Sequence, residues 1–250
     1  MNILQALVAL LIIYVLFGLI LYFIQSSMIY HPDKTPFEEC TTGEMQTHGK
    51  ARFYLAGNQE SEKQIIVYHG NAGRACDRIP LVEMINPEYS YIIVEYPGYG
   101  EIEKPSKQKI LEAVKDVREY AEQQNKETYL LGISLGSSVA AYHASLKEPE
   151  GLIMIAPFYS AASVARRTFF MYPVSLILRE NYETNKYLEG YEGKVLILHG
   201  EIDRTIPLSE SEKLHREIEN SERHIISSAH HNNMFQQRET TTKINEFIQN

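Results

Sequence analysis

The chain has 250 residues, of which 44% are hydrophobic and 22% charged, a composition that is ordinary for a globular protein and excludes a disordered one. Its 24 basic and 32 acidic side chains give a net charge of −8, so we expect no nucleic-acid partner. Two cysteines are too few for a disulfide-rich scaffold or a four-cysteine zinc site.

The N-terminal segment carries no Asp, Glu, Lys or Arg before Asp33. Residues 3–24 are almost all apolar, and a helix of that length would extend about 33 Å, enough to cross the ~30 Å hydrocarbon core of a bilayer. A cleavable signal peptide would have an N-terminal cation, a shorter apolar stretch and a small-residue cleavage site. A core helix that is apolar on every side is rare in a domain of this size. We therefore expect residues 1–27 to form an uncleaved single-pass membrane anchor.

The sequence says little about which side of the membrane the rest of the chain occupies. Lys34 is the only Lys or Arg within about 15 residues after the apolar segment, which points weakly to a cytoplasmic location. Cys40 and Cys76 could form one disulfide or remain two buried thiols, and we expect two thiols. The membrane side is therefore left open.

From residue 28 to residue 250 we predict one α/β domain without internal repeats. Residues 36–56 are typical of an antiparallel hairpin at a sheet edge. Residues 107–124 carry an apolar stripe of helical period and follow the start signals Pro105 and Ser106. Six apolar runs are continuous rather than alternating, which is typical of strands covered on both faces; they are residues 64–69, 89–95, 128–133, 152–156, 195–199 and 223–227. This alternation of strands and helices predicts a mostly parallel, doubly wound sheet.

The strand at residues 128–133 runs into the pattern Gly132-Ile133-Ser134-Leu135-Gly136, which is G-x-S-x-G. A serine on a tight turn from strand to helix exposes its hydroxyl above the sheet, and glycines two residues away let the neighbouring backbone approach closely. The helix that follows presents backbone N–H groups to a developing oxyanion. We therefore predict Ser134 as a catalytic nucleophile.

A serine nucleophile needs a base, and the base needs a carboxylate that orients it. Asp203 lies in the loop after the strand at 195–199, and Glu201 is the nearest alternative. Both His230 and His231 follow the last strand, and the residues alone leave the choice between them open. We expect no metal site, because the two histidines have neither an H-E-x-x-H motif nor a carboxylate cluster.

His69-Gly70-Asn71-Ala72-Gly73 follows the strand at residues 64–69. In this position the loop predicts one half of an oxyanion hole, which the backbone N–H of Asn71 would form together with that of Leu135. His69 and His199 each precede a glycine at a strand end. We expect both to stabilise turns rather than to act in catalysis.

These motifs resemble those of the membrane-anchored α/β-hydrolase-domain proteins, in the serine-aminopeptidase-like branch of the α/β-hydrolase superfamily. The resemblance implies the α/β-hydrolase fold, and it places His231 rather than His230 as the base. Ser137 stands where the family usually has a second glycine, and Asn233 where Asp is common. The loop at residues 99–106, YGEIEKPS, also departs from the family pattern. The resemblance is carried by MIYHP (28–32), YHGNAG (68–73), EYPGYG (95–100), LLGISLGSSVAA (130–141), IAPFYS (155–160), ILHGEIDRTIP (197–207) and HHNNMF (230–235).

Residues 158–191, here called the cap segment, are rich in apolar and aromatic side chains. They fall where α/β-hydrolases insert cap elements, so they either form a small cap that lines an acyl pocket or pack on the sheet as ordinary helix. We expect three arginines of this segment, Arg166, Arg167 and Arg179, to be solvated surface residues.

Together these features predict a serine hydrolase that cleaves carboxylic esters or thioesters, with acyl lipids as the substrate class. Ser134, His231 and Asp203 would form the catalytic triad of an acyl-enzyme mechanism that uses no metal or organic cofactor. A serine peptidase or amidase on the same triad, and a non-catalytic binding protein on the same fold, are the two alternatives. The oligomeric state is left open.

Overall fold

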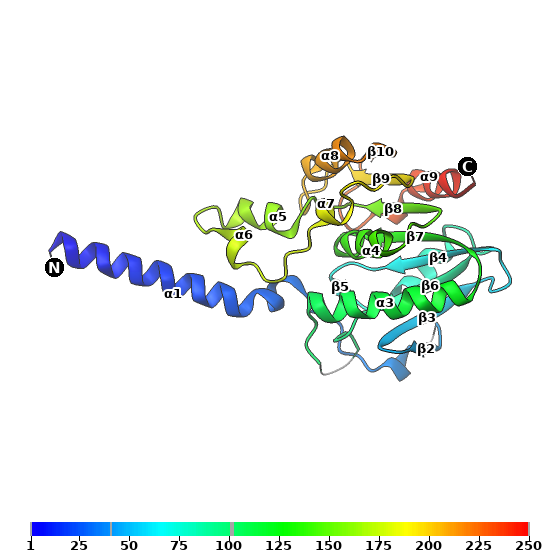
Figure 1. Cartoon of the computed structure of the whole chain (residues 1–250), viewed down its shortest axis with the longest axis horizontal. Helices are drawn as coiled ribbons and strands as arrows, with labels where there is room; N and C mark the ends of the chain where they lie inside the picture. The colour runs from blue at the N-terminus through cyan, green and yellow to red at the C-terminus, as the bar shows by residue number, and fades with distance from the viewer. Residues whose placement is uncertain (1, 41, 101–102, 250) are drawn as a thin grey trace.

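A long helix precedes a body built around a central sheet in the computed structural model, which describes residues 2–40, 42–100 and 103–249. The side chain of Asn2 caps the first turn of this helix, α1 (Ile3–Ile29). The most apolar window of α1 has a mean hydropathy of 3.0, and none of that window is buried. The helix is therefore long and apolar enough to cross a membrane, and it extends away from the body in Figure 1.

The central sheet has, among the described residues, eight strands in the order β10-β9-β8-β7-β4-β6-β3-β2. The strands from β10 to β6 are parallel, whereas β3 is antiparallel to both of its neighbours. A separate short pair joins β1 (His31–Pro32) to β5 (Ala72–Gly73). The strands of the central sheet are β2 (Met45–His48), β3 (Ala51–Gly57), β4 (Lys63–Tyr68), β6 (Ser90–Glu95), β7 (Glu127–Ile133), β8 (Gly151–Ile155), β9 (Val195–Gly200) and β10 (Ser221–Ile226).

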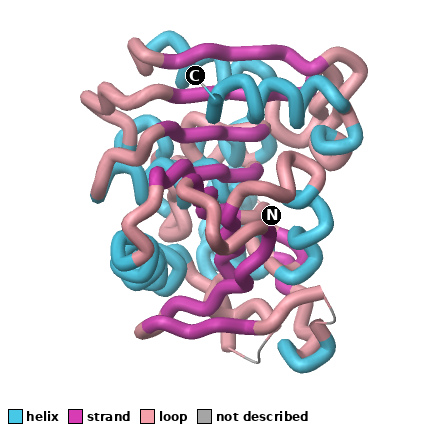
Figure 2. Tube along the Cα trace, turned by 90° about the vertical axis from the view of Figure 1, so that its right-hand side faces the viewer, coloured by secondary structure: helices cyan, strands magenta, loops and turns pink. Residues whose placement is uncertain are grey.

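Helices flank the strands of the central sheet on both sides (Figure 2). Side chains of the inner strands alternate between two cores, one on each face of the sheet. In β4, Ile66 and Tyr68 enter one core while Ile65 and Val67 enter the other, and all four are fully buried. Because both faces are covered, the strands form continuous apolar runs in the sequence. The first core is covered by α3 (Lys107–Gln123), α4 (Leu135–Leu146) and α8 (Leu208–Glu217), and the second by α2 (Ile79–Glu83) and α9 (Arg238–Gln249).

The predicted elements are confirmed with small shifts. Each of the six predicted strands is present, with ends that differ by one or two residues. The predicted helix at 107–124 is α3, whose first turn is capped by the Ser106 hydroxyl. The hairpin is confirmed as β2 and β3, but it begins at Met45 rather than at residue 36. The prediction was wrong for its first part because Pro36 leads into a short 3-10 helix, η1 (Phe37–Glu39).

The two cysteines form a disulfide, which corrects the expectation of two thiols. Cys40 follows η1, and Cys76 opens the 3-10 helix η2 (Cys76–Arg78). Their Cα atoms lie 6.1 Å apart, within the range that a disulfide requires. Strands β2, β3, β4 and β5 lie between the two cysteines in the chain. Their approach therefore depends on long-range strand pairing, which the residues around each cysteine do not encode.

The cap segment forms three short helices between β8 and β9: α5 (Ala161–Thr168), α6 (Val174–Ile177) and α7 (Thr184–Tyr187). In Figure 1, α5 and α6 lie beside α1, beyond the end of the sheet, whereas α7 lies against α4. The aromatic rings of Tyr142 and Tyr187 connect α4 to α7 with centroids 5.4 Å apart. The first part of the segment therefore covers one end of the sheet, and its last part packs on the body.

Candidate active site

Ser134 lies in the sharp turn between β7 and α4. Its backbone has φ 53° and ψ −114°, a strained conformation for a residue other than glycine. The flanking glycines are sterically required, because a β-carbon at Gly136 would lie 2.0 Å from the Tyr68 carbonyl oxygen. A β-carbon at Gly132 would lie 2.4 Å from the Gly136 carbonyl oxygen. The predicted turn is therefore present, and it lifts the serine hydroxyl above the C-terminal edge of the sheet.

The three predicted triad residues lie in one hydrogen-bonded chain. His231 Nε2 is 3.0 Å from Ser134 Oγ, and His231 Nδ1 is 2.7 Å from Asp203 Oδ2. Asp203 comes from the loop after β9, and His231 comes from the loop between β10 and the 3-10 helix η3 (Met234–Gln236). All three residues follow the C-terminal ends of parallel strands, and this is why residues so distant in sequence meet at one edge.

The competing residues point elsewhere. His230 is exposed, and its backbone N–H donates to the Asn233 side-chain oxygen at 2.7 Å. Glu201 is also exposed and accepts hydrogen bonds from the Ser228 backbone and the Ser227 hydroxyl, which lower the pKa of its carboxyl group. The structure therefore places His231, and not His230, against Ser134, and Asp203, and not Glu201, behind His231.

The Asp203 carboxylate is enclosed by hydrogen-bond donors. Its side chain is 0% exposed, and Oδ1 accepts from the backbone N–H groups of Thr205 at 2.8 Å and Ile206 at 2.9 Å. Burial by itself raises the pKa of Asp203, but hydrogen bonds from His199, His231 and the Ile206 backbone lower the pKa further. The net result is a pKa well below the usual range, so Asp203 is ionised at neutral pH.

His199 also contacts the Asp203 carboxylate, which the sequence did not predict. Its Nε2 lies 3.4 Å from Asp203 Oδ2 and 3.0 Å from the Ile206 carbonyl oxygen, and its side chain is fully buried. The imidazole thus braces the turn, as expected, and also contacts the carboxylate. Its place at the end of β9, just before the Asp203 loop, was the available signal.

The two predicted oxyanion donors, Asn71 and Leu135, both line the cavity at Ser134. Among the described residues, neither backbone N–H donates to a protein acceptor. Asn71 is held by its side chain, which donates to the Ile29 carbonyl at 2.8 Å, and by its own carbonyl, which accepts from the Tyr99 hydroxyl at 2.8 Å. This arrangement is compatible with an oxyanion hole, and that role stays a prediction.

The loop that carries Asn71 is braced from below by buried polar groups. The His69 ring stacks on Tyr96 with centroids 4.1 Å apart, and its Nε2 lies 3.5 Å from Glu95 Oε1. The Glu95 carboxylate accepts the Ala75 backbone N–H at 3.0 Å, at the far end of the same loop. His69 therefore has the structural role that was expected of it.

The departures from the family pattern are accommodated locally. The Ser137 hydroxyl donates to the Gly132 carbonyl at 2.9 Å, so the serine is satisfied where the family has glycine. Asn233 accepts the His230 N–H and thereby shapes the loop that holds His231. In the loop at 99–106, Glu101 and Ile102 lie outside the described residues.

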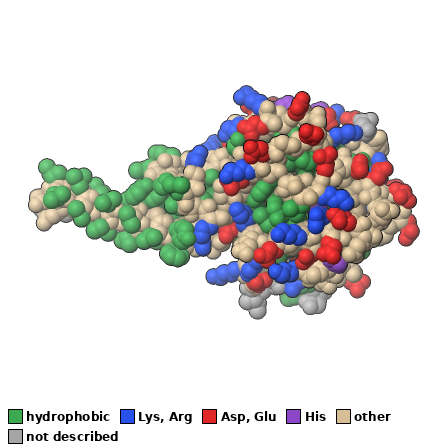
Figure 3. Space-filling view, viewed as in Figure 1, with side chains coloured by type: hydrophobic (Ala, Val, Ile, Leu, Met, Phe, Trp, Pro, Cys, Tyr) green, Lys and Arg blue, Asp and Glu red, His purple; other side chains and the backbone are tan. Residues whose placement is uncertain are grey.

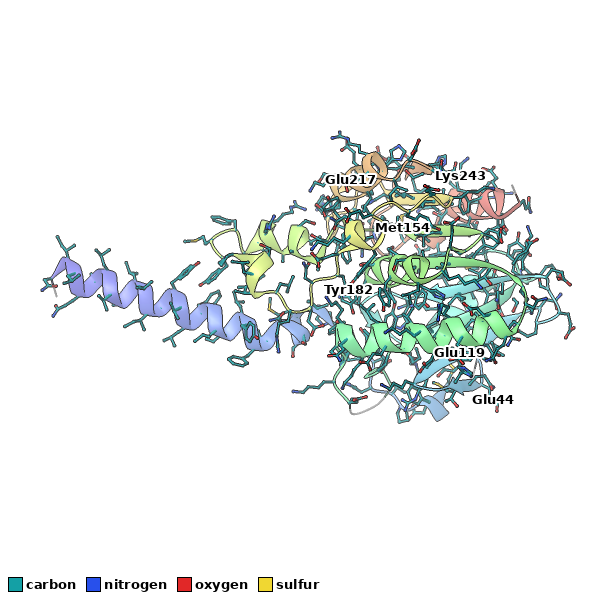
Figure 4. All side chains as sticks on the ribbon, viewed as in Figure 1. Glu44, Glu119, Met154, Tyr182, Glu217 and Lys243 are labelled. Atoms are coloured by element: carbon teal, nitrogen blue, oxygen red, sulfur yellow. A yellow bond between two sulfur atoms is a disulfide. The ribbon has the colours of Figure 1, made fainter. Side chains whose placement is uncertain are left out.

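A cavity of about 500 Å³ opens directly above Ser134 and His231. The cap segment supplies one side of it, through apolar residues that include Val164, Phe169 and Leu178. The end of α1 supplies another side, which the sequence did not indicate. Tyr182, labelled in Figure 4, lies fully buried where the cap segment and the body meet. Within the described parts of the chain, no group of three or more His, Cys, Asp or Glu side chains could hold a metal ion.

Comparison with known proteins places the chain in a family. Residues 85–235, which include Ser134, Asp203 and His231, match the family model described as serine hydrolase (FSH1). The chain belongs to the FSH1 serine hydrolase family. The predicted α/β-hydrolase fold is confirmed by similarity to an esterase of Pyrococcus furiosus, with a TM-score of 0.66 and 14% identity over 88% of this chain and 97% of that one.

The relatives found by sequence share less than a third of their residues with this chain in the matched regions. Protein Rv2307c of Mycobacterium tuberculosis is 26% identical over 65% of this chain, and the match spans 60% of the length of that relative. YfhR of Salmonella typhimurium is 29% identical over 78% of this chain and 74% of its own length. The membrane anchor and the serine-aminopeptidase-like branch stay predictions.

Proposed function

We propose that this serine hydrolase cleaves carboxylic esters or thioesters of acyl lipids through an acyl-enzyme intermediate, and that α1 anchors it in a membrane. The observation that carries the proposal is the continuous chain from Ser134 through His231 to Asp203, at the base of an apolar cavity. The chemistry follows from that chain and from the donors beside it.

The nucleophile is generated by proton transfer within the chain. His231 Nε2 takes the proton of Ser134 as the hydroxyl oxygen attacks the acyl carbonyl carbon. Asp203, ionised and buried, accepts the Nδ1–H of His231, which fixes the imidazole tautomer and stabilises the imidazolium. The backbone N–H groups of Asn71 and Leu135 donate to the oxyanion of the tetrahedral intermediate.

The intermediate collapses as His231 returns its proton to the departing alcohol or thiol, which leaves the acyl group on Ser134. A water molecule then attacks the acyl carbon while His231 again accepts a proton. The second tetrahedral intermediate collapses as the bond from the acyl carbon to Ser134 Oγ breaks, His231 returns the proton to that oxygen, and the carboxylic acid is released. Each N–H donor of such an oxyanion hole typically contributes about 3 kcal/mol to the lowering of the barrier.

The composition of the cavity wall supports an acyl substrate over a peptide. An aminopeptidase needs a carboxylate to hold the amino group of its substrate, and none of the described residues that line the cavity is acidic. The lining is mainly aliphatic and aromatic, which suits a hydrocarbon chain.

Turnover of matched substrates by the full-length protein in detergent tests the proposal. We expect p-nitrophenyl acyl esters to be hydrolysed, aminoacyl p-nitroanilides to remain intact, and Ser134→Ala to lose the esterase activity. Preferred cleavage of the anilides would favour the peptidase alternative. An absence of turnover on both substrate classes would favour the non-catalytic alternative.

A further inference from the structure

The C-terminal turns of α1 line the same cavity as the candidate nucleophile, Ser134. Five residues of the helix line that cavity together with Ser134 and His231; they are Leu21, Tyr22, Gln25, Met28 and Ile29. Figure 1 shows this half of α1 running beside α5 and α6, while the first turns of the helix stand free. A helix that only tethers the body would not need to share a wall with the active site.

Gln25 fastens α1 to the cap segment. It is the only buried residue of α1, all of which the structure describes, with 6% of its surface exposed. Its side-chain oxygen accepts the backbone N–H groups of Arg179 at 2.6 Å and Glu180 at 3.2 Å. Its amide nitrogen donates to the Tyr22 carbonyl at 2.7 Å. Because its oxygen bonds two backbone N–H groups of the cap segment, this buried amide fixes which face of α1 is turned toward that segment.

Glu180 extends this contact into the body. Its buried carboxylate accepts hydrogen bonds from the Tyr30 hydroxyl at 2.7 Å and from the Lys107 backbone N–H, at the start of α3, also at 2.7 Å. The Ser26 hydroxyl reaches the other carboxylate oxygen at 3.2 Å. The end of α1, the cap segment and α3 therefore share one buried carboxylate.

A second contact between α1 and the cap segment lies nearer the N-terminus of the helix. The rings of Tyr14 and Tyr172 stack with centroids 4.5 Å apart and planes 2° from parallel. Their hydroxyls donate to main-chain carbonyls across the contact, Tyr14 to Met171 at 2.7 Å and Tyr172 to Tyr14 at 3.0 Å. Gly18 makes room for the Tyr172 ring, because a β-carbon there would lie 3.0 Å from it. From Tyr14 to Tyr30 the helix is thus held over about 24 Å.

We propose that the second half of α1 is a wall of the acyl-binding pocket and determines which acyl chains reach Ser134. The occupant is the hydrocarbon chain of a lipid ester, which lies between α1 and the α5–α6 part of the cap segment. The inference rests on the proposed esterase function and adds a specificity element to it. Its evidence is the fixed rotation of α1, which turns Leu21 and Met28 toward the cavity, and the apolar character of both walls.

Two substitutions on the same turn of α1 test the pocket wall. Leu21 lines the cavity, whereas Leu19 does not and is 49% exposed. In the full-length protein, Leu21→Trp fills the pocket, so we expect the ratio of kcat/KM for p-nitrophenyl octanoate to that for the acetate to fall about tenfold or more. Leu19→Trp should keep the wild-type ratio. Equal ratios in the two variants would overturn the inference.

A second pair of variants tests the pocket wall if the bulky indole of Leu21→Trp prevents folding. Gln25→Leu keeps the helix apolar but removes its bonds to Arg179 and Glu180, and it should also lower the octanoate-to-acetate ratio. The control is Gln5→Leu, at an exposed position at the other end of the helix. An unchanged ratio in Gln25→Leu would overturn the inference.

Labelling of Ser134 by a fluorophosphonate distinguishes a failure of the proposed esterase function from a failure of the role proposed for α1. If the wild type is not labelled and hydrolyses neither ester, the proposed function itself fails. If the wild type is labelled and active but the acyl preference is indifferent to Leu21 and Gln25, only the role of α1 fails.

Discussion

The carboxylate of Asp203 is surrounded by donors from three parts of the chain. The turn at Thr205 and Ile206 binds one oxygen, while His231 and His199 approach the other. Because these contacts hold the pKa of Asp203 far below its usual range, the residue supplies a fixed negative charge behind the imidazole. In the proposed mechanism, this carboxylate orients the His231 imidazole by accepting its Nδ1–H.

Replacing this charge should impair the chemistry far more than the fold. Asp203→Asn keeps the shape but presents an amide that favours the wrong imidazole tautomer, so we expect kcat for ester hydrolysis to fall by about 10⁴. Steady-state kinetics on a soluble acyl ester measures this effect. The matched control is Glu201→Gln, at the neighbouring exposed carboxylate, which should retain wild-type kcat. Equal losses in the two variants would contradict the assignment.

At the scale of elements, the turn from β7 to α4 depends on backbone packing that only glycine permits. The helix begins immediately after Ser134, so its first turn passes close to the end of β4. Strain in the serine backbone is maintained because the neighbouring strands fix both sides of the turn. We therefore expect both stability and esterase activity to depend on Gly136.

Gly136→Ala should lower both the stability of the fold and the esterase activity. Its methyl group would overlap the Tyr68 carbonyl, so we expect a loss of unfolding free energy of about 3 kcal/mol or more, with loss of esterase activity. Gly190→Ala is a suitable comparison, because Gly190 has φ 70° but nothing within 4 Å of its added carbon. That variant should lose only about 1 kcal/mol and stay active. Urea unfolding and ester turnover provide the two measurements, and a fully active, stable Gly136→Ala would refute the packing argument.

The elements were predictable where the signal is local. Continuous apolar runs located the six strands, and the residues at their ends located Ser134, Asp203 and His231, because parallel strands align their C-terminal ends. Long-range features were not predictable. The Cys40–Cys76 disulfide depends on the folded approach of segments 36 residues apart, which no short motif records. The contact of His199 with Asp203 is local, between residues four apart, but it depends on how the turn after β9 directs the two side chains.

At the scale of the whole molecule, α1, the cap segment and the body form one continuous structure. Residues 1–27 differ from residues 28–250 in charge and apolar content, so the sequence predicts two separate parts. The stacking of Tyr14 on Tyr172 joins these parts, and composition carries no information about such a contact. Figure 3 shows mainly hydrophobic side chains along α1 and the adjoining part of the cap segment, while charged side chains are spread over the body. If α1 spans the bilayer, this contact carries the tip of the cap segment into lipid.

The depth of that tip can be measured because the chain has no tryptophan. Phe170, Met171 and Leu176 are 79%, 68% and 84% exposed, and we expect this surface to lie among acyl chains. In vesicles that contain brominated phospholipid, the fluorescence of Phe170→Trp should be strongly quenched. Met84→Trp, at the exposed C-cap of α2 before the N-terminal end of β6, should be unaffected. Equal quenching at the two positions would contradict the membrane arrangement.

The disulfide joins the N-terminal part of the body to the segment that follows the Asn71 loop. It closes a loop between residues 36 apart in sequence, which corresponds to about 4 kcal/mol in the chain-entropy estimate. Reduction should therefore lower the urea midpoint of the full-length protein in detergent. The double variant Cys40→Ser/Cys76→Ser should unfold at the lower midpoint and show no response to reductant. A wild-type midpoint that is unaffected by reduction would count against the bond.

The central claim is that Ser134 is a nucleophile activated by His231. Mass spectrometry of peptides from the fluorophosphonate-treated protein tests this claim most directly. The account predicts one phosphonylated residue, Ser134, with labelling abolished in Ser134→Ala and greatly slowed in His231→Ala. Modification of a different residue, or equal labelling of the wild type and Ser134→Ala, would contradict it.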